Sequence, residues 1–125
     1  MGQRILIAED DPSIQKLFTI ILTREGYEIE VSSDGQMVYE NTTELPSLFI
    51  LDRQLKNACD GLEACRYLKS QEATKNIPVI MISATPEIGR LAKSAGAEDY
   101  LEKPFSMNVL LQKIRQFLNP TDGIS

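Results

Sequence analysis

The sequence predicts a doubly wound α/β protein, in which helices cover both faces of a five-stranded parallel sheet. Two observations carry this prediction. Short, nearly continuous apolar runs are typical of strands buried on both faces of a parallel sheet, and three occur here, at residues 5–8, 48–51 and 79–82. Amphipathic stretches alternate with these runs, and such alternation favours β–α–β units with right-handed crossovers.

Two weaker segments complete the predicted sheet. Ile29 and Val31 alternate with glutamates, a pattern that indicates a more peripheral strand. Residues 100–101 indicate a short fifth strand.

Helix start and stop signals separate the predicted strands. Asp11 and Pro12 supply an N-cap and a first-turn proline for a helix that continues to Gly26. By the same kinds of signal, we expect further helices from Asp60 to Leu68, from Thr85 to near Gly96 and from Ser106 to before Pro120, with a weaker one at 35–44.

Length and composition limit the class of protein. The 125 residues allow one domain, which we expect at 1–120, followed by a short tail at 121–125. A formal net charge of −5 disfavours nucleic-acid binding, which needs a basic surface to neutralise phosphates. No apolar run approaches the roughly 20 residues that span a membrane, and no signal-peptide pattern is present, so we expect a cytoplasmic protein without a membrane partner. Without histidine, the usual zinc sites and histidine-based triads are excluded.

Polar residues follow the predicted strands where ligands of open parallel sheets bind, beyond the carboxyl ends. These residues are Glu9, Asp10, Asp11, Asp52, Ser83, Thr85 and Lys103. Two like charges about 5 Å apart repel by about 3 kcal/mol at an effective dielectric constant of 20, so the carboxylates need more positive charge than Lys103 supplies. Oxygen ligands without histidine or cysteine favour Mg²⁺ or Mn²⁺. The sequence therefore predicts a metal-dependent phosphoryl site.

The order of five segments makes the chain similar to a known family. The segments ILIAEDD, LD, DGLE, SA and AGAEDYLEKPF begin at residues 5, 51, 60, 83 and 95. In this order they resemble the receiver domain of two-component response regulators, the fold of the chemotaxis regulator, from Arg4 to about Leu118. The resemblance implies a flavodoxin-like sheet with strand order 2-1-3-4-5. It also implies a signalling switch that catalyses only its own phosphoryl transfer and dephosphorylation, rather than an enzyme.

The resemblance also implies roles for the residues of the phosphoryl site. Asp52 would accept a phosphoryl group from a phosphohistidine on a sensor histidine kinase or a histidine phosphotransfer protein. Glu9 and Asp10 match the acidic pair that holds Mg²⁺, Asp10 directly and Glu9 partly through water. Asp52 and the backbone carbonyl of Gln54 would complete the protein ligands, and Lys103 would pair with the phosphoryl group.

Further roles concern the response to phosphorylation. Ser83 matches the switch residue that hydrogen-bonds the phosphoryl group. Tyr100 matches an aromatic switch position, although a half-buried tyrosine on an edge strand explains it nearly as well. Gln54 and Thr85 lie where the family adjusts access of the hydrolytic water. The resemblance further implies a cis Lys103–Pro104 bond, and a downstream protein target that binds the face of the fourth helix, fifth strand and fifth helix. Asp11 is assigned to the helix cap.

Two loops depart from the family's usual spacing. Loop 53–60 is one residue longer than is usual in the family and lacks the usual proline. The chain from Ser83 to Lys103 is about two residues shorter than is usual, and this difference lies in the stretch 84–97. These departures leave a second interpretation open, a non-phosphorylated pseudo-receiver that acts as a protein-docking module. A Mg²⁺-dependent phosphatase is a further alternative, disfavoured because Gln54 stands where that chemistry usually places an aspartate. A piece of a larger regulator or hybrid kinase also fits.

Overall fold

The computed structural model describes residues 3–40, 45–55 and 60–118, and it confirms the predicted parallel sheet. The strands are β1 (Arg4–Ala8), β2 (Glu28–Ser32), β3 (Leu48–Asp52), β4 (Val79–Ser83) and β5 (Asp99–Glu102). Their order is β2-β1-β3-β4-β5, and all neighbouring strands pair in parallel. The order reverses between β1 and β3, where open α/β sheets bind their ligands.

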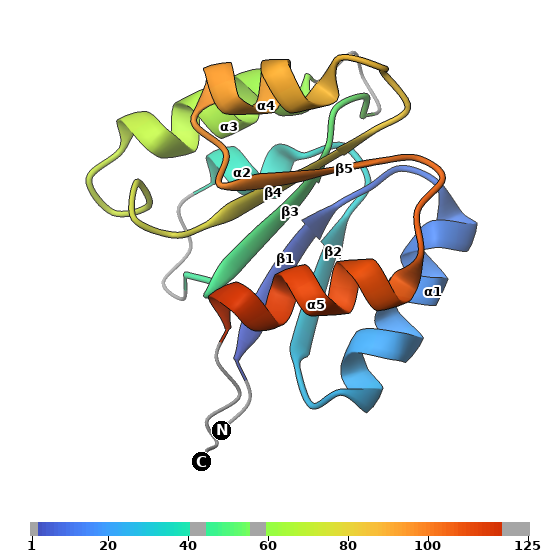
Figure 1. The fold of residues 1–125 in the computed structure, drawn as a ribbon. Helices are drawn as coiled ribbons and strands as arrows, with labels where there is room; N and C mark the ends of the chain where they lie inside the picture. Colours follow the sequence, from blue (N-terminus) through green and yellow to red (C-terminus); the bar gives the residue numbers. More distant parts are fainter. Residues whose placement is uncertain (1–2, 41–44, 56–59, 119–125) are drawn as a thin grey trace.

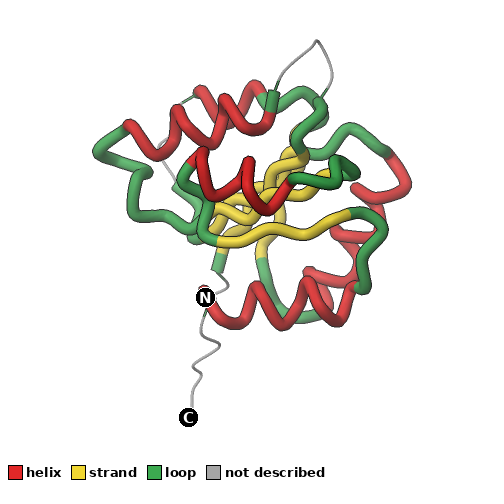
Figure 2. Tube along the Cα trace, turned by 45° about the horizontal axis from the view of Figure 1, so that its top comes forward, coloured by secondary structure: helices red, strands yellow, loops and turns green. Residues whose placement is uncertain are grey.

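Helices cover both faces of the sheet (Figures 1 and 2). They are α1 (Pro12–Arg24), α2 (Gln36–Tyr39), α3 (Gly61–Ser70), α4 (Ile88–Ala95) and α5 (Met107–Phe117). Helices α1 and α5 lie on one face, and α2, α3 and α4 lie on the other. No helix within these described ranges is long and apolar enough to cross a membrane.

The double covering explains why the central strands β1, β3 and β4 are apolar at all positions except one end of each. In β1, Ile5 and Ile7 pack into the core beneath α1 and α5, whereas Leu6 and Ala8 pack into the core beneath the other three helices. Successive side chains of a strand point to opposite faces, so a sheet buried on both faces requires an unbroken apolar run. Burial on both faces of the sheet, which the prediction assumed, is therefore the reason that these strands are apolar runs.

Three predicted helix starts are confirmed by their caps. The Asp11 carboxylate accepts hydrogen bonds from the backbone N–H groups of Ser13 and Ile14. Asp60 caps α3 through the N–H of Leu62, and Ser106 caps α5 in the same manner. These caps satisfy N–H groups that have no partner inside the helix.

The predicted start of α4 is wrong. The helix begins at Ile88 rather than directly after Thr85 and Pro86. The Thr85 hydroxyl accepts a hydrogen bond from Arg53 instead of capping a helix, and the Thr85 carbonyl accepts the Ile88 N–H in a preceding turn. The predicted stop near Gly96 is confirmed, since this residue caps α4 with a left-handed φ of 91°.

The weak helix expected at 35–44 is present only as α2 among the described residues, because 41–44 lie outside them. The predicted tail at 121–125 and half of loop 53–60, namely residues 56–59, also lie outside them. The prediction of a domain ending at residue 120 thus stays a prediction.

Candidate functional site

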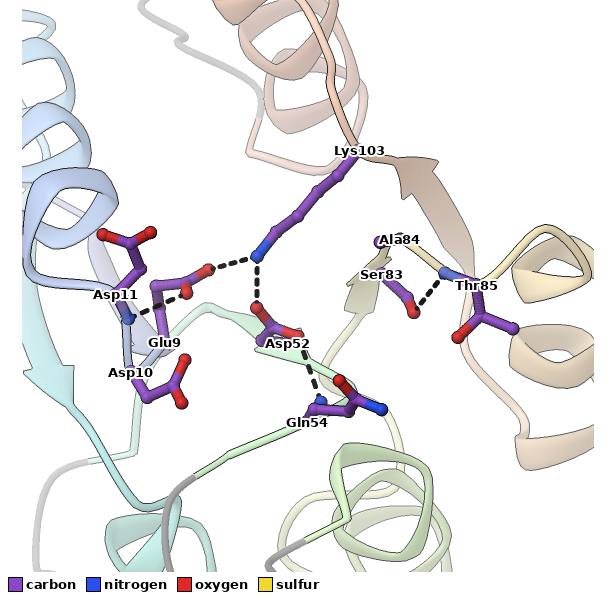
Figure 3. A pocket seen from close by; sticks show the side chains of 9 residues that line it. All are labelled: Glu9, Asp10, Asp11, Asp52, Gln54, Ser83, Ala84, Thr85 and Lys103. Atoms are coloured by element: carbon purple, nitrogen blue, oxygen red, sulfur yellow. Dashed lines mark hydrogen bonds and ion pairs between the residues drawn. The ribbon is translucent and has the colours of Figure 1, made fainter.

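A polar pocket of about 360 Å³ lies at the carboxyl ends of β1, β3, β4 and β5. It is lined by Glu9, Asp10, Asp11, Asp52, Gln54, Ser83, Ala84, Thr85 and Lys103 (Figure 3). The sheet therefore brings together all the predicted site residues except Tyr100. Segments far apart in sequence meet here because parallel strands end at one edge of the sheet.

Three carboxylates converge at one side of this pocket. Oxygen atoms of Glu9, Asp10 and Asp52 all lie within 4.8 Å of one another. Glu9 is 1% exposed and Asp52 5% exposed, so two of the three carboxylates are removed from water. Glu9 Oε1 is buried, and its partner among the described residues is the Lys103 ammonium at 3.3 Å. A donor set of three converging carboxylates, two of them buried, fits a hard divalent cation such as Mg²⁺ or Mn²⁺.

Burial and the neighbouring negative charge both favour the protonated form of Glu9. Burial raises the pKa of Glu9 from 4.5 to about 7, and the charge of Asp52 adds to this effect. The hydrogen bond from the Asp11 N–H and the charge of Lys103 oppose the rise without cancelling it. Burial and the charge of Asp52 thus make an ionised Glu9 costly in this pocket.

Lys103 is the cation of the pocket and connects two of its acids. Its Nζ lies 2.5 Å from Asp52 Oδ2 and 3.3 Å from Glu9 Oε1. Burial by itself lowers the pKa of Lys103, but the hydrogen bond to Asp52 and the charges of Asp52 and Glu9 outweigh burial and raise it. The peptide bond between Lys103 and Pro104 is cis, as predicted.

Asp52 is held by a second hydrogen bond on its other oxygen. The backbone N–H of Gln54 donates to Asp52 Oδ1 at 3.1 Å. With one oxygen bound to Gln54 and the other to Lys103, the carboxylate is fixed facing the pocket (Figure 3). A carboxylate oriented in this manner beside cationic groups can act as a nucleophile towards phosphorus.

Ser83 and Thr85 form the side of the pocket opposite the acidic pair. Ser83 Oγ is buried and accepts a hydrogen bond from the Thr85 N–H at 2.9 Å, which directs the hydroxyl towards Thr85 (Figure 3). Its proton stays available for an oxygen acceptor in the pocket, since a hydroxyl both donates and accepts.

Tyr100 lies apart from this group of residues. Its side chain is 44% exposed and does not line the pocket. The ring lies against α4 at Gly89, where a Cβ on the glycine would come within 2.8 Å of Tyr100 Cζ. The structure therefore places Tyr100 in an outward position on an edge strand.

Two residues near the pocket are not identified by the sequence reasoning as contributors to it. Arg53 Nη1 donates to Thr85 Oγ1 at 3.1 Å and so connects the segments that follow β3 and β4. Gly61 lies so close to the end of β3 that a Cβ would overlap the backbone oxygen of Asp52. The only sequence signal for Arg53 is its place beside Asp52, and the need for glycine at position 61 comes from tertiary packing.

Comparison with known proteins agrees with this fold and site. Residues 5–115 match the family model of the response regulator receiver domain. The chain belongs to this family of two-component signalling domains, which are signalling modules rather than true enzymes. Its acidic pocket of Glu9, Asp10 and Asp52 is consistent with the phosphoacceptor site of a receiver domain.

Individual relatives show how far the similarity extends. The chain is 38% identical over 124 residues to the DNA-binding dual master transcriptional regulator RpaA of Synechocystis sp., a match that covers 97% of this chain and 51% of that protein. The chain thus spans about half the length of the curated relatives it matches.

Two solved receiver domains have nearly the same fold. The receiver domain of the sensor histidine kinase PA1611 from Pseudomonas aeruginosa, described with a magnesium ion coordinated in its active-site cleft, is 29% identical with a TM-score of 0.83. The BeF3-activated DrrB receiver domain is 28% identical with a TM-score of 0.82. Each similarity covers 95% of this chain and 99% of the other chain.

Proposed function

We propose that the protein receives a phosphoryl group on Asp52 from a phosphohistidine, with Mg²⁺ held by Glu9, Asp10 and Asp52. The observation that carries this proposal is the buried Asp52 carboxylate, fixed by Lys103 and the Gln54 N–H beside an acidic pair. The magnesium described in the PA1611 receiver domain supports the metal, and the receiver family implies a histidine kinase or a histidine phosphotransfer protein as the donor. The proposed location is the cytoplasm, where ATP is available to such kinases.

In the proposed reaction, an Asp52 oxygen forms a bond to phosphorus while the phosphorus–nitrogen bond of the phosphohistidine breaks. The electron pair of the broken bond stays on the imidazole nitrogen. Bound Mg²⁺ supplies charge neutralisation at the phosphoryl oxygens, the main requirement of phosphoryl transfer. Lys103 adds positive charge beside Asp52, and the free hydroxyl proton of Ser83 can be donated to a phosphoryl oxygen. The backbone carbonyl of Gln54 is proposed as a further metal ligand.

An apolar groove beside the pocket fits a protein as the phosphoryl donor. This groove of about 430 Å³ runs between α1 and the start of α5 and is lined by Ile14, Leu17, Phe18, Ala84, Lys103, Pro104, Phe105 and Met107. It shares Ala84 and Lys103 with the polar pocket. A histidine carried by a protein reaches Asp52 only if the donor's surface lies on this rim, so we assign the groove to the donor.

The proposed output surface is the face of α4, β5 and α5. Tyr100 lies on this face against α4, and β5 pairs with β4 directly beside Ser83. We propose that phosphorylation shifts this face between two states that differ in affinity for a downstream protein. Typical allosteric couplings of about 1–3 kcal/mol suffice for such a switch. With a net charge of −5, the domain itself is not proposed to contact nucleic acid.

Intact-mass measurement after incubation with acetyl phosphate tests the phosphoryl-acceptor proposal. We expect the gain of one phosphoryl group only with Mg²⁺, and no gain in Asp52→Asn. Asp11→Asn is the matched control, because it removes a neighbouring rim carboxylate while keeping a side chain that caps helices well; it should still gain the group. A folded protein that gains nothing and binds no Mg²⁺ would instead be a pseudo-receiver that serves as a docking module.

A further inference from the structure

Arg53 connects the two loops that border the polar pocket on its β3–β4 side. It follows β3 directly, and its N–H continues the pairing with β4 by donating to the Ile82 carbonyl at 2.9 Å. Its side chain then reaches beyond the end of β4 and donates to Thr85 Oγ1 at 3.1 Å. The backbone of Arg53 thus binds strand β4, and its side chain binds the segment that leads from β4 into α4.

The guanidinium of Arg53 makes this contact without an acidic partner. Among the described residues, no carboxylate lies within ion-pair distance of Arg53, and Thr85 accepts its one side-chain hydrogen bond. A guanidinium has five N–H donors in a fixed plane, so it holds the Thr85 hydroxyl in a defined direction. Ordering the long side chain of Arg53 costs conformational entropy, and the resulting contact fixes Thr85 in the wall of the pocket.

Thr85 transmits this restraint to the pocket. Thr85 and Ser83 both line the pocket, and the Thr85 N–H donates to Ser83 Oγ. The hydrogen bonds therefore run from Arg53 through Thr85 to Ser83, opposite the acidic pair (Figure 3 shows the Thr85–Ser83 part). Loss of the first bond frees the Thr85 side chain at the open side of the pocket.

We propose that Arg53 and Thr85 form a tie between the β3–α3 and β4–α4 loops that restricts the access of water and small phosphoryl donors to Asp52. Arg53 is in this sense a positioning residue that acts through Thr85. The proposal rests on the function proposed above and adds a restraint that sets the rates of phosphoryl gain and loss. Because the same opening admits a small donor and water, removal of the tie accelerates both processes.

Phosphorylation kinetics of the whole chain test the tie. Intact mass spectrometry follows phosphoryl gain from acetyl phosphate with Mg²⁺, and phosphoryl loss after the donor is removed. We expect Arg53→Ala and Thr85→Val each to accelerate both rates about fivefold, the effect of losing one partly exposed hydrogen bond. The double variant should match the single variants, because either change already breaks the bond. Thr85→Ser keeps a hydroxyl and should lie closer to the unaltered protein than Thr85→Val does.

A matched control and a second readout separate the tie from general effects. Arg66→Ala removes the same charge from an exposed position on α3 and should leave both rates unchanged. Amide hydrogen exchange in the unphosphorylated protein should be faster at residues 84–88 in Arg53→Ala and Thr85→Val, and not in Arg66→Ala.

If the unaltered protein gains a phosphoryl group, two results would overturn the tie. One is unchanged rates of phosphoryl gain and loss in Arg53→Ala, and the other is additive effects in the double variant. If the unaltered protein gains none, the proposed function fails. The tie is then decided by exchange at residues 84–88 alone, and an unchanged exchange rate refutes it.

Discussion

Replacement of Glu9 by glutamine should stabilise the Mg²⁺-free protein, and more so at high pH. The pKa of Glu9 is raised from 4.5 to about 7 by burial and by the charge of Asp52. The folded state thus binds this proton more tightly than the unfolded state does. The resulting destabilisation is absent below about pH 4.5, grows as the pH rises towards 7, and is constant above pH 7.

The size of the effect follows from the shift. Each pKa unit corresponds to about 1.4 kcal/mol, so an ionised Glu9 lowers the free energy of unfolding by at most about 3 kcal/mol above pH 7. Glutamine carries no charge and retains an oxygen that can accept the Asp11 N–H, which now donates to Glu9 Oε2. We therefore expect Glu9→Gln to be about 2–3 kcal/mol more stable than the unaltered protein at pH 8, and more stable by less than about 1 kcal/mol at pH 5.

Urea unfolding followed by far-UV circular dichroism in EDTA at both pH values measures this difference. Glu28→Gln is the matched control, because Glu28 is an exposed glutamate on the edge strand β2. Two results would refute the argument that ionised Glu9 destabilises the folded protein. One is an equal stability difference between Glu9→Gln and the unaltered protein at pH 5 and pH 8, and the other is a Glu9→Gln that is less stable than the unaltered protein at pH 8.

Addition of Mg²⁺ should reduce the stability advantage of Glu9→Gln at pH 8. Metal binding needs deprotonated carboxylates, and Glu9→Gln removes one of the three that converge. The unaltered protein should therefore gain more stability from Mg²⁺ than Glu9→Gln does, and its gain should be larger at pH 8 than at pH 5. Equal gains in stability for the two proteins would show that Glu9 does not take part in metal binding.

The remaining predictions concern a glycine, a groove and a lysine. Gly61→Ala should lower the free energy of unfolding by about 1–3 kcal/mol and slow phosphoryl gain, because its Cβ would overlap the backbone of Asp52; unchanged urea unfolding and uptake would contradict this. Leu17→Asp, in the groove and 44% exposed, should slow transfer about tenfold from a histidine kinase that phosphorylates the unaltered chain. Acetyl phosphate uptake should stay the same, and Ile20→Asp, similarly exposed on α1 but outside the groove, should have little effect; equal losses in both variants would remove the groove from docking. Lys69→Met should cost about 1–3 kcal/mol in thermal or urea unfolding, because Lys69 Nζ donates to the Ile77 carbonyl and to Glu98 with only 14% of its side chain exposed; a smaller cost would mean that water replaces these bonds.

Much of the site was predictable because its residues stand at strand ends. Glu9, Asp52, Ser83 and Lys103 each follow an apolar run or a short strand in the sequence. Parallel pairing carries these ends to one edge, so the composition of the pocket could be inferred without coordinates. The roles of these residues in phosphoryl transfer come from the family resemblance and stay predictions.

The start of α4 shows where local signals were insufficient. Thr85 and Pro86 form a good helix start by sequence, yet the Thr85 hydroxyl binds Arg53, 32 residues earlier in the chain. The Thr85 hydroxyl is thus engaged by a long-range partner and not by the first turn of the helix. The position of Tyr100 against Gly89 is likewise a matter of packing between β5 and α4.

By itself the sequence determined the class of sheet and the residue types that line the pocket. Apolar periodicity and the residue types at strand ends are local properties, and burial on both faces of a parallel sheet follows from them. Only the tertiary structure decided the pKa of Glu9, the contact of Arg53 with Thr85, and the need for glycine at position 61. Each of these depends on burial and on distances between segments far apart in the chain, quantities that exist only after the sheet and helices have packed.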